Sequence, residues 1–341
     1  MFDQALTDAV LTAGRSAGLV AVGVTTEEIL EPARSMLHSR KAGGLASSMA
    51  FTYRNPDRST DPRSSLPSVR SVVAGAWDYR RLTPDSESAI AGRVARYSWV
   101  DHYSDLRNAL GEMGEVLKLA GYRAVIKADD NAIVDRNVAW RAGLGWYGKN
   151  SNLLIPGVGS WVVLGCVVTD APLVRNEVPV QDACGPCRRC IDGCPTGAIV
   201  APGIVDARLC LAWLVQGPEP IPVELRSALG DRLYGCDDCQ EVCPPAKFTA
   251  APEAEPGSET EVDLTWLLNA SDAELLDRLG RWYIADRNPN VIRRTALVVM
   301  GNTADPGDPG AIGLLERYAR DPDPQLSEHA RWALDRLEER A

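Results

Sequence analysis

The 341-residue chain contains only three histidines, and it lacks both an excess of positive charge and a long apolar run. Few imidazole groups are therefore available as metal ligands. The net charge of −10 argues against loose, sequence-independent attachment to nucleic acid or to anionic membranes, although it is compatible with a local basic patch. No apolar run has the length needed to span a bilayer, so we expect no membrane segment.

The chain begins Met1-Phe2-Asp3-Gln4-Ala5, which lacks the basic and apolar regions of a secretory signal and has no twin-arginine pair. We therefore expect a cytoplasmic protein, in a compartment where thiols stay reduced. The apolar fraction of 45% and the charged fraction of 24% are ordinary for a globular protein. The length allows two or three domains.

Cysteine is the residue type that this chain concentrates, because eight of its nine cysteines lie between positions 184 and 243. The first run reads C-x-x-C-x-x-C-x-x-x-C-P and the second reads C-x-x-C-x-x-x-C-P, with one further cysteine between them. This spacing is typical of two [4Fe–4S] clusters of the bacterial ferredoxin kind. The residues are Cys184, Cys187, Cys190, Cys194 and Pro195, then Cys210, then Cys236, Cys239, Cys243 and Pro244.

Two-residue gaps let one tight loop offer three thiolates to one cubane, while the cysteine before proline ligates the other cluster. Cys210 supplies the ligand that the shorter second run lacks. The predicted ligands are Cys184, Cys187, Cys190 and Cys243 for one cluster, and Cys194, Cys210, Cys236 and Cys239 for the other.

Two other uses of cysteine compete with the clusters. Structural zinc also uses C-x-x-C pairs, but usually four ligands per ion and no C-x-x-x-C-P ending. Disulfides would need an oxidising compartment. The ninth cysteine, Cys166, lies in an apolar run, and we expect it to be a small buried hydrophobic residue.

Alternating helix and strand patterns predict an α/β or α+β domain over residues 1–175. Helices are expected over 3–17, 103–119 and 134–142, strands over 19–24, 71–77, 123–127 and 160–169, a helix start at 25–28, a loop over 54–68 and a turn at 129–131. Bound clusters should organise residues 176–250 as a ferredoxin-like domain. Residues 251–341 are expected to hold a linker to about residue 262 and an all-α segment with helices over 291–300, 310–320 and 325–340, resembling one or two HEAT repeats.

Residues 143–148 fit the pattern G-x-G-x-x-G, which in dinucleotide-binding proteins follows a strand and opens a helix. Here the glycines follow a predicted helix and lead toward a strand, so we do not expect a nicotinamide site. Lys149 and Asn150 remain candidates for facing a ligand, since glycine-rich loops allow close approach.

Several stretches together resemble one family, the tRNA epoxyqueuosine reductases. The resemblance covers nearly the whole chain, and its most specific part is the second cysteine run combined with the displaced Cys210. The matching residues are 128–132, 135–136, 142–146, 148–150, 159–161, 164–165, 184–198, 208–210 and 231–236.

This resemblance implies an N-terminal domain like that of corrinoid reductases, with a base-off cobalamin that receives electrons from an external donor through both clusters. It implies reduction of the epoxide of epoxyqueuosine in tRNA to the alkene of queuosine, the last step of that modification. The scarcity of histidine suits a cobalt without a histidine lower ligand. The family's proton donor matches Asp129, although the residues alone favour a simple turn at Asp129-Asp130-Asn131. A desolvated pocket would keep such a carboxyl group protonated near neutral pH.

The family's cobalamin contacts are also carried over by resemblance. By pattern alone, Leu153 and Leu164 are core strand positions and Ala212 lies on a helix face, so a structural role stays open for them. Asp237 lies between two cluster ligands, where a contact with the corrin edge would shorten the electron path. The matching positions are Arg58, Ala95, Asp129, Leu153, Leu164, Ala212, Gln216, Cys236 and Asp237.

The tRNA side of the resemblance rests on residues 292–296, with Arg294 as the expected contact. Arg281, Arg287, Arg293 and Arg294 form either a basic face for phosphates or a solvated helix face. Pro218 stands where relatives often carry a lysine, and the helical tail is shorter than in many relatives. We expect a monomer.

Two other functions stay open at this point. One is another cytoplasmic corrinoid and iron–sulfur reductase, similar to the reductive dehalogenases. The other is an electron-transfer protein of ferredoxin type with docking helices, which would leave the large N-terminal domain without a purpose. Failure to bind a corrinoid favours the second alternative, and corrinoid binding without any effect on tRNA nucleosides favours the first.

Overall fold

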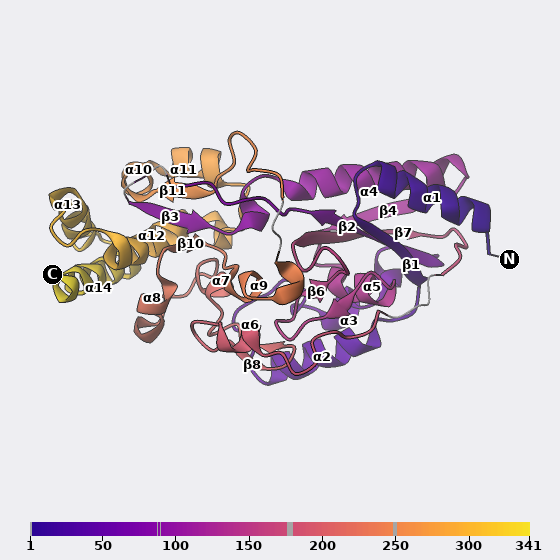
Figure 1. Ribbon diagram of the computed structural model, residues 1–341, viewed down its shortest axis with the longest axis horizontal. Coiled ribbons are helices and arrows are strands. Elements are labelled where there is room, and N and C mark those ends of the chain that lie inside the picture. The colour runs from indigo at the N-terminus through magenta and orange to yellow at the C-terminus, as the bar shows by residue number, and fades with distance from the viewer. Residues whose placement is uncertain (1, 87, 89, 176–179, 248–250) are drawn as a thin grey trace.

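A four-stranded sheet in the order β1-β2-β7-β4 forms the centre of the N-terminal part. This computed structural model describes residues 2–86, 88, 90–175, 180–247 and 251–341. In Figure 1 the sheet lies toward the N-terminal end of an elongated molecule, and the last helices lie at the opposite end. Every neighbouring pair is antiparallel among β1 (Ala21–Thr26), β2 (Ser71–Asp78), β7 (Val162–Thr169) and β4 (Ala124–Ala128).

Alternating side chains give this sheet two apolar faces. Val73 and its β7 partner Val167 belong to a core that also holds residues of α1 (Gln4–Ser16) and α4 (His102–Leu119). The adjacent strand positions Val72 and Val168 belong to a second core with α2 (Glu31–Ala42) and α5 (Asp135–Arg141). Helices therefore cover both faces of the sheet.

Glycine has a specific role where α4 crosses the sheet. Gly75 and Gly165 pair across β2 and β7, and a methyl group added to either would lie within 3.0 Å of the Leu110 side chain. Their lack of side chains lets α4 lie close to the strands. Cys166 is fully buried on the other face, which confirms its prediction as a small core residue.

The helices and strands predicted before residue 175 are confirmed, mostly to within one or two residues at each end. The helix start expected at residues 25–28 is wrong. Thr25 and Thr26 end β1, where they pair with Val72 and Ser71, and α2 begins at Glu31. Pairing with β2 outweighs the local threonine cap signal, because it satisfies the backbone of these residues within the sheet.

The loop expected over 54–68 contains two short helical turns, α3 (Pro56–Ser59) and η1 (Pro62–Ser64). Each has proline in its first turn and a capping side chain before it, Asn55 and Asp61 respectively. These are helix-start signals, and in so short a segment they resemble loop composition.

A second sheet joins three distant parts of the chain. Strand β3 (Ala91–Val94) pairs in parallel with β10 (Arg232–Tyr234) and antiparallel with β11 (Glu261–Asp263). One strand of this sheet comes from each of the three expected domains, whose boundaries were placed after residues 175 and 250. Both boundaries adjoin residues outside the described ranges. The sequence pattern did not indicate β3.

The cysteine-rich part has only short elements, as expected where metal binding organises a segment. Two short strands, β5 (Trp146–Tyr147) and β6 (Leu153–Leu154), pair as a hairpin just before β7. The elements after it are α6 (Arg189–Asp192), β8 (Ile199–Ala201), β9 (Ile204–Val205), α7 (Leu211–Leu214), α8 (Val223–Leu229), α9 (Asp238–Glu241) and η3 (Pro244–Ala246).

The C-terminal part is helical, and α12, α13 and α14 confirm the three predicted helices. Gly301 of α12 packs against Ala333 of α14, where an added methyl group would lie 2.8 Å away. Likeness to a HEAT repeat remains a prediction. Within the described ranges, no helix combines the length and apolarity needed to cross a membrane. The helices are α10 (Leu264–Asn269), α11 (Asp272–Leu279), η4 (Ala285–Arg287), α12 (Asn290–Thr303), α13 (Pro309–Tyr318) and α14 (Pro324–Arg340).

Candidate functional site

The two cysteine runs meet through their short helices. Cys190 lies on α6 and Cys239 on α9, and these helices pack against each other. Gly193, at the end of α6, leaves room for this contact, because an added methyl group would lie 3.2 Å from the Val242 side chain. The fold thus places the ligand loop of each run beside the other.

The structure groups the eight cysteines in two sets. Burial raises the pKa of Cys243 to about 11, and the neighbouring thiols that add to the rise are Cys190, Cys184 and Cys187. Burial likewise raises the pKa of Cys239, and its thiol neighbours are Cys236, Cys210 and Cys194. These sets have the same members as the two predicted ligand groups.

All nine cysteines are free thiols in the structure. Among the described residues, no three His, Cys, Asp or Glu side chains stand close enough to hold a single metal ion. A cubane distributes its four thiolates over four iron atoms, so its ligands stand farther apart than those of one zinc ion. The finding therefore applies to sites for a single metal ion, of which the described residues form none.

Gly235 brings the second ligand loop against the start of η2 (Arg96–Ser98). It adopts φ of 72°, and a methyl group added to it would lie 2.5 Å from Cβ of Ala95. Ala95 is buried and donates its N–H to the Tyr234 carbonyl oxygen over 2.8 Å. Two predicted corrin contacts, Ala95 and Cys236, are therefore held on adjacent backbone segments.

Asp237 anchors the same contact from inside the protein. Its side chain is only 4% exposed, and its Oδ2 accepts the Arg96 N–H over 2.8 Å. Its Oδ1 accepts a hydrogen bond from Nε2 of Gln240 over 3.1 Å. Burial raises the pKa of Asp237 to about 6, although the backbone N–H and the charge of Arg96 oppose the rise.

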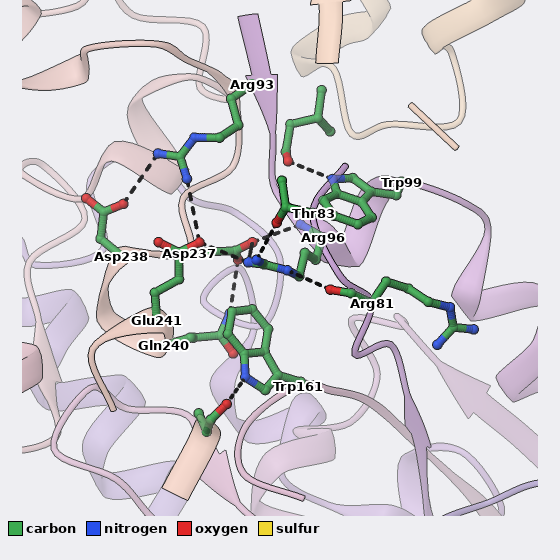
Figure 2. A network of polar contacts seen from close by, with 12 residues as sticks. Arg81, Thr83, Arg93, Arg96, Trp99, Trp161, Asp237, Asp238, Gln240 and Glu241 are labelled. Atoms are coloured by element: carbon green, nitrogen blue, oxygen red, sulfur yellow. Dashed lines mark hydrogen bonds and ion pairs between the residues drawn. The ribbon is translucent and has the colours of Figure 1, made fainter. Parts of the chain in front are cut away.

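Arginines neutralise the acidic side of this loop, as Figure 2 shows. Arg96 donates to Glu241 over 2.9 Å and lies 4.9 Å from the ring centroid of Trp161. Arg93 lies 3.7 Å from Glu241 and 3.8 Å from Asp238. Because both arginines come from the segment around β3, charge pairs as well as strand pairing fix the second cysteine run.

Asp129 lies at the end of β4 in a left-handed backbone conformation with φ of 53°. Its side chain reaches solvent, yet the surrounding protein desolvates it enough to raise the pKa of its carboxyl group. The charge of Arg107 opposes this rise, and that of Asp130 adds to it. The predicted turn formers hold this position, since Asp130 accepts the Ala132 N–H over 2.8 Å.

Tyr97 lies beside Gly235 of the cluster loop, and the charge of Asp129 acts on its hydroxyl group. Burial raises the pKa of Tyr97 to about 12, and the carboxylates of Asp237 and Asp129 add to the rise. Its hydroxyl accepts a hydrogen bond from Nε2 of Gln216 over 2.8 Å. Tyr97, which the sequence reasoning did not single out, therefore bonds to Gln216 and lies within the electrostatic influence of Asp129 and Asp237.

The other predicted corrin contacts lie in different settings. Arg58 is exposed on α3 and donates to Oδ1 of Asn131 over 3.2 Å, beside the Asp129 turn. Leu153 and Leu164 are buried on β6 and β7, as their pattern indicated. Ala212 is partly buried on α7, directly after the Cys210 ligand position. Arg58 therefore shares the neighbourhood of Asp129, whereas the two leucines belong to the core.

Asp135 is a second acid beside Asp129 that the sequence reasoning missed. Burial raises its pKa well above the ordinary value, the charges of Asp129 and Asp130 add to the rise, and its carboxylate accepts the backbone N–H of Asp129. One of its oxygens has no partner among the described residues. The sequence offered one signal for this residue, because Asp135 follows Asp129 by six positions and lies at the start of a predicted helix.

Arg294, expected to contact tRNA, is fully buried on α12. Its guanidinium donates to the carbonyl oxygens of Leu214 over 2.8 Å, of Gly217 over 3.2 Å and of Glu219. Arg293 is 8% exposed and pairs with Asp272 over 2.6 Å. These two side chains hold the helical part to its neighbours, which argues against a phosphate contact by Arg294.

Residues 183–246 match the family model of a 4Fe-4S double cluster binding domain. The chain is 33% identical to the epoxyqueuosine reductase of Bacillus subtilis (strain 168), with 95% of this chain and 85% of the relative covered. It is 34% identical to the epoxyqueuosine reductase of Xanthomonas campestris pv. campestris, with 95% and 94% covered.

Solved structures agree with these relatives. A crystal structure of epoxyqueuosine reductase with a tRNA-Tyr epoxyqueuosine-modified stem loop matches at a TM-score of 0.88 and 31% identity, covering 98% of this chain and 90% of the other. A Bacillus subtilis epoxyqueuosine reductase with an aspartate catalytic loop swung out of the active site matches at 0.87 and 31%, with the same coverage. Sequence and fold therefore agree over nearly the full length, and the chain belongs to the epoxyqueuosine reductase family.

Proposed function

We propose that this protein reduces epoxyqueuosine in tRNA to queuosine, using two [4Fe–4S] clusters, cobalamin and Asp129. The observation that carries the proposal is the match to epoxyqueuosine reductases over nearly the whole chain, joined to a double-cluster segment whose two short cysteine helices pack together. Conversion of an epoxide to an alkene takes up two electrons and two protons and releases the oxygen as water. The chain must therefore deliver single electrons and hold a proton near the epoxide oxygen.

The cysteine sets suit the electron delivery. Cys184, Cys187, Cys190 and Cys243 would bind one cubane, and Cys194, Cys210, Cys236 and Cys239 the other. The packing of α6 on α9 supports a short path between the clusters. Gly235, next to Cys236, lies against Ala95 and Tyr97, and Asp237 accepts the Arg96 N–H, so electrons would leave the second cluster toward this segment.

The three histidines of the chain lie in contacts with other parts of the fold. His38 pairs with Asp57, His329 accepts the Ile221 N–H, and His102 is buried beside Tyr79. His38 and His329 therefore already have polar partners, which agrees with a base-off cobalamin without a histidine ligand from either of them. When bound, cobalamin supplies low-potential electron transfer to the epoxide carbon. The residues that would hold it are Arg58, Ala95, Asp129, Ala212, Gln216, Cys236 and Asp237, with Leu153 and Leu164 supporting them from the core.

Asp129 would donate a proton from its carboxyl group to the leaving oxygen. Partial desolvation favours the protonated form, which is the form a general acid needs. Asp135 accepts the Asp129 N–H and thereby orients the turn that carries the donor. A relative whose catalytic loop carries an aspartate supports this assignment.

The proposed substrate is tRNA, because a related reductase has been solved with an epoxyqueuosine-modified stem loop. We do not assign Arg294 to that contact, since its guanidinium is held by backbone carbonyl groups. The protein is proposed to act as a cytoplasmic monomer that receives electrons from an external donor.

The decisive experiment is anoxic reconstitution with cobalamin and a reductant on tRNA that carries epoxyqueuosine, followed by nucleoside mass spectrometry. We expect queuosine to accumulate, with about eight iron and eight sulfide per chain, as two cubanes require. Zinc in place of iron, or unchanged epoxyqueuosine in the presence of both cofactors, would contradict the proposal. A clustered protein that binds no corrinoid would point to an electron carrier, and corrinoid binding without nucleoside conversion would point to another corrinoid reductase.

A further inference from the structure

The glycine-rich stretch at residues 143–148 leads from α5 into the first strand of a hairpin and does not form a nucleotide-binding loop. Gly143 ends α5 with φ of 75°, and a methyl group added to Gly145 would clash with the Leu154 carbonyl group. Strands β5 and β6 follow, and residues 148–152 form the tip between them. Within this tip the Gly148 N–H donates to the Asn152 carbonyl oxygen over 2.8 Å. The glycines therefore shape a rigid turn.

Two consecutive residues at this tip reach the two cysteine runs. The Lys149 ammonium donates to the carbonyl oxygens of Gly185 over 2.6 Å and of Cys187 over 2.9 Å. Nδ2 of Asn150 donates to the carbonyl oxygen of Cys239 over 3.2 Å. Gly185 and Cys187 belong to the first run, and Cys239 belongs to the second. One dipeptide thus binds one ligand loop of each predicted cluster.

Hydrogen bonds hold the tip in place, so its side chains can fix the positions of the two cysteine loops. Asn150 is 5% exposed, and its Oδ1 accepts the Asn152 N–H over 3.2 Å. The Lys149 carbonyl oxygen accepts the Gly203 N–H over 2.9 Å, and the Ser151 hydroxyl donates to the Gly203 carbonyl oxygen over 3.1 Å. The side chains of Lys149 and Asn150 therefore project from a support that is bonded on both sides.

We propose that Lys149 and Asn150 position the two cluster-binding loops relative to each other, and that the Lys149 charge raises the reduction potential of the cluster held by Cys184, Cys187, Cys190 and Cys243. The inference rests on the cluster ligands given under the proposed function. A reduced cluster carries one more negative charge than the oxidised one. An ammonium bonded to the backbone of a ligand cysteine stabilises that added charge, and so favours the reduced state. Asn150 has no charge, so its effect on the second cluster would be positional.

The test is potentiometric titration of the anoxic holoprotein, followed by electron paramagnetic resonance, for Lys149→Met, Lys149→Arg and Asn150→Ala. Cys210→Ser changes only the second ligand set and assigns the two signals. Lys149→Met should shift the first cluster to a more negative midpoint and leave the second at its parental value. Lys149→Arg, which keeps charge and donors, should stay close to the parent. Asn150→Ala should alter the signal or iron content of the second cluster alone.

Lys118→Met is the matched control, because Lys118 is an exposed residue of α4 whose ammonium pairs with Glu115 of the same helix, and its loss should shift neither potential. Selective loss of the first cluster from Lys149→Met would also support the proposed positioning of the first cysteine loop by Lys149. Parental potentials in Lys149→Met, or equal loss of both clusters, would overturn it. If the parent protein itself lacks two clusters, the proposed function fails. If the parent has both and the variants match it, only this inference fails.

Discussion

Asp129 shows how one residue acquires a chemical role from its position. The residue lies in a turn that its sequence already favours, and its pKa is raised by desolvation, with the charge of Asp130 adding to the rise and that of Arg107 opposing it. Its charge adds to the rise that burial causes in the pKa values of Tyr97 in η2 and Tyr103 in α4. Partial desolvation is an ordinary way to keep an acid protonated near neutral pH.

Asp129→Asn should retain iron and cobalamin and lose most turnover, by about 100-fold or more, because a general acid typically contributes that much. Nucleoside mass spectrometry on epoxyqueuosine tRNA measures the loss. Asp130→Asn is the matched control: it removes the ion pair with Lys127 but can still accept the Ala132 N–H, so it should keep far more activity. Full activity in Asp129→Asn would remove this residue as the proton donor.

The single-turnover rate should fall as pH rises through the pKa of Asp129. The protonated carboxyl is the active form, and desolvation raises its pKa above the ordinary 3.8, so the decline begins at a higher pH than for an exposed aspartate. Rates measured across the acidic to neutral range test this. The residual rate of Asp129→Asn should show no such decline, and an identical profile in both proteins would contradict the assignment.

At the scale of elements, the site depends on close contacts between backbone segments as well as on the cluster ligands, because these contacts set where its residues lie. The loop that carries Cys236 meets η2 through Gly235, and α12 meets the segment after α7 through Arg294. Both contacts join parts of the chain that are far apart in sequence. Changes at either contact should therefore act on stability and cofactor retention together.

Gly235→Ala should lower the unfolding temperature and the iron content of the holoprotein. The left-handed backbone alone costs about 1–2 kcal/mol for alanine, and the new methyl group would in addition lie 2.5 Å from Ala95 Cβ. Gly257→Ala is the control, since Gly257 has φ of 83° with nothing within 4 Å. Anoxic thermal unfolding with iron analysis distinguishes them, and equal losses in both variants would show that the Ala95 contact is unimportant.

Arg294→Met should destabilise the protein by on the order of 3–5 kcal/mol, because buried hydrogen-bond partners would be left unsatisfied. Three backbone carbonyl oxygens depend on this guanidinium. Arg320→Met, which removes an exposed pair with Glu316, should have almost no effect. Denaturant unfolding measures both. Unchanged stability with weakened tRNA binding would instead restore Arg294 as a direct contact.

At the scale of the whole molecule, the second sheet ties the three expected parts together. β3, β10 and β11 come from the three regions, and their side chains share one core with the C-terminal helices, including Val94, Leu233, Val262 and Leu297. In Figure 1 this sheet lies between the large sheet and the terminal helices. The helical part is therefore a structural support for the segment that carries Ala95 and Arg96.

Removal of residues 251–341 should leave the remaining chain insoluble or unable to keep its second cluster. The truncation deletes β11 and most of the apolar partners of Val94 and Leu233, and exposed core of this size promotes aggregation. Solubility and iron content of the truncated chain test the idea, and co-expression of residues 251–341 should restore both. A soluble 1–250 chain with eight iron per chain would show that the helices are independent.

The sequence by itself determined the features that depend on local spacing. Gaps of two and three residues define the cysteine runs. The periodicity of apolar residues predicted the helices α1, α4, α5, α12, α13 and α14. Only the tertiary structure decided that β3 joins a sheet of distant strands, that Thr25 and Thr26 extend β1, that Arg294 is buried, and that Lys149 and Asn150 reach the cysteine loops. Local signals report what a segment can form alone, whereas pairing, burial and hydrogen-bond partners depend on which distant segment folds against it.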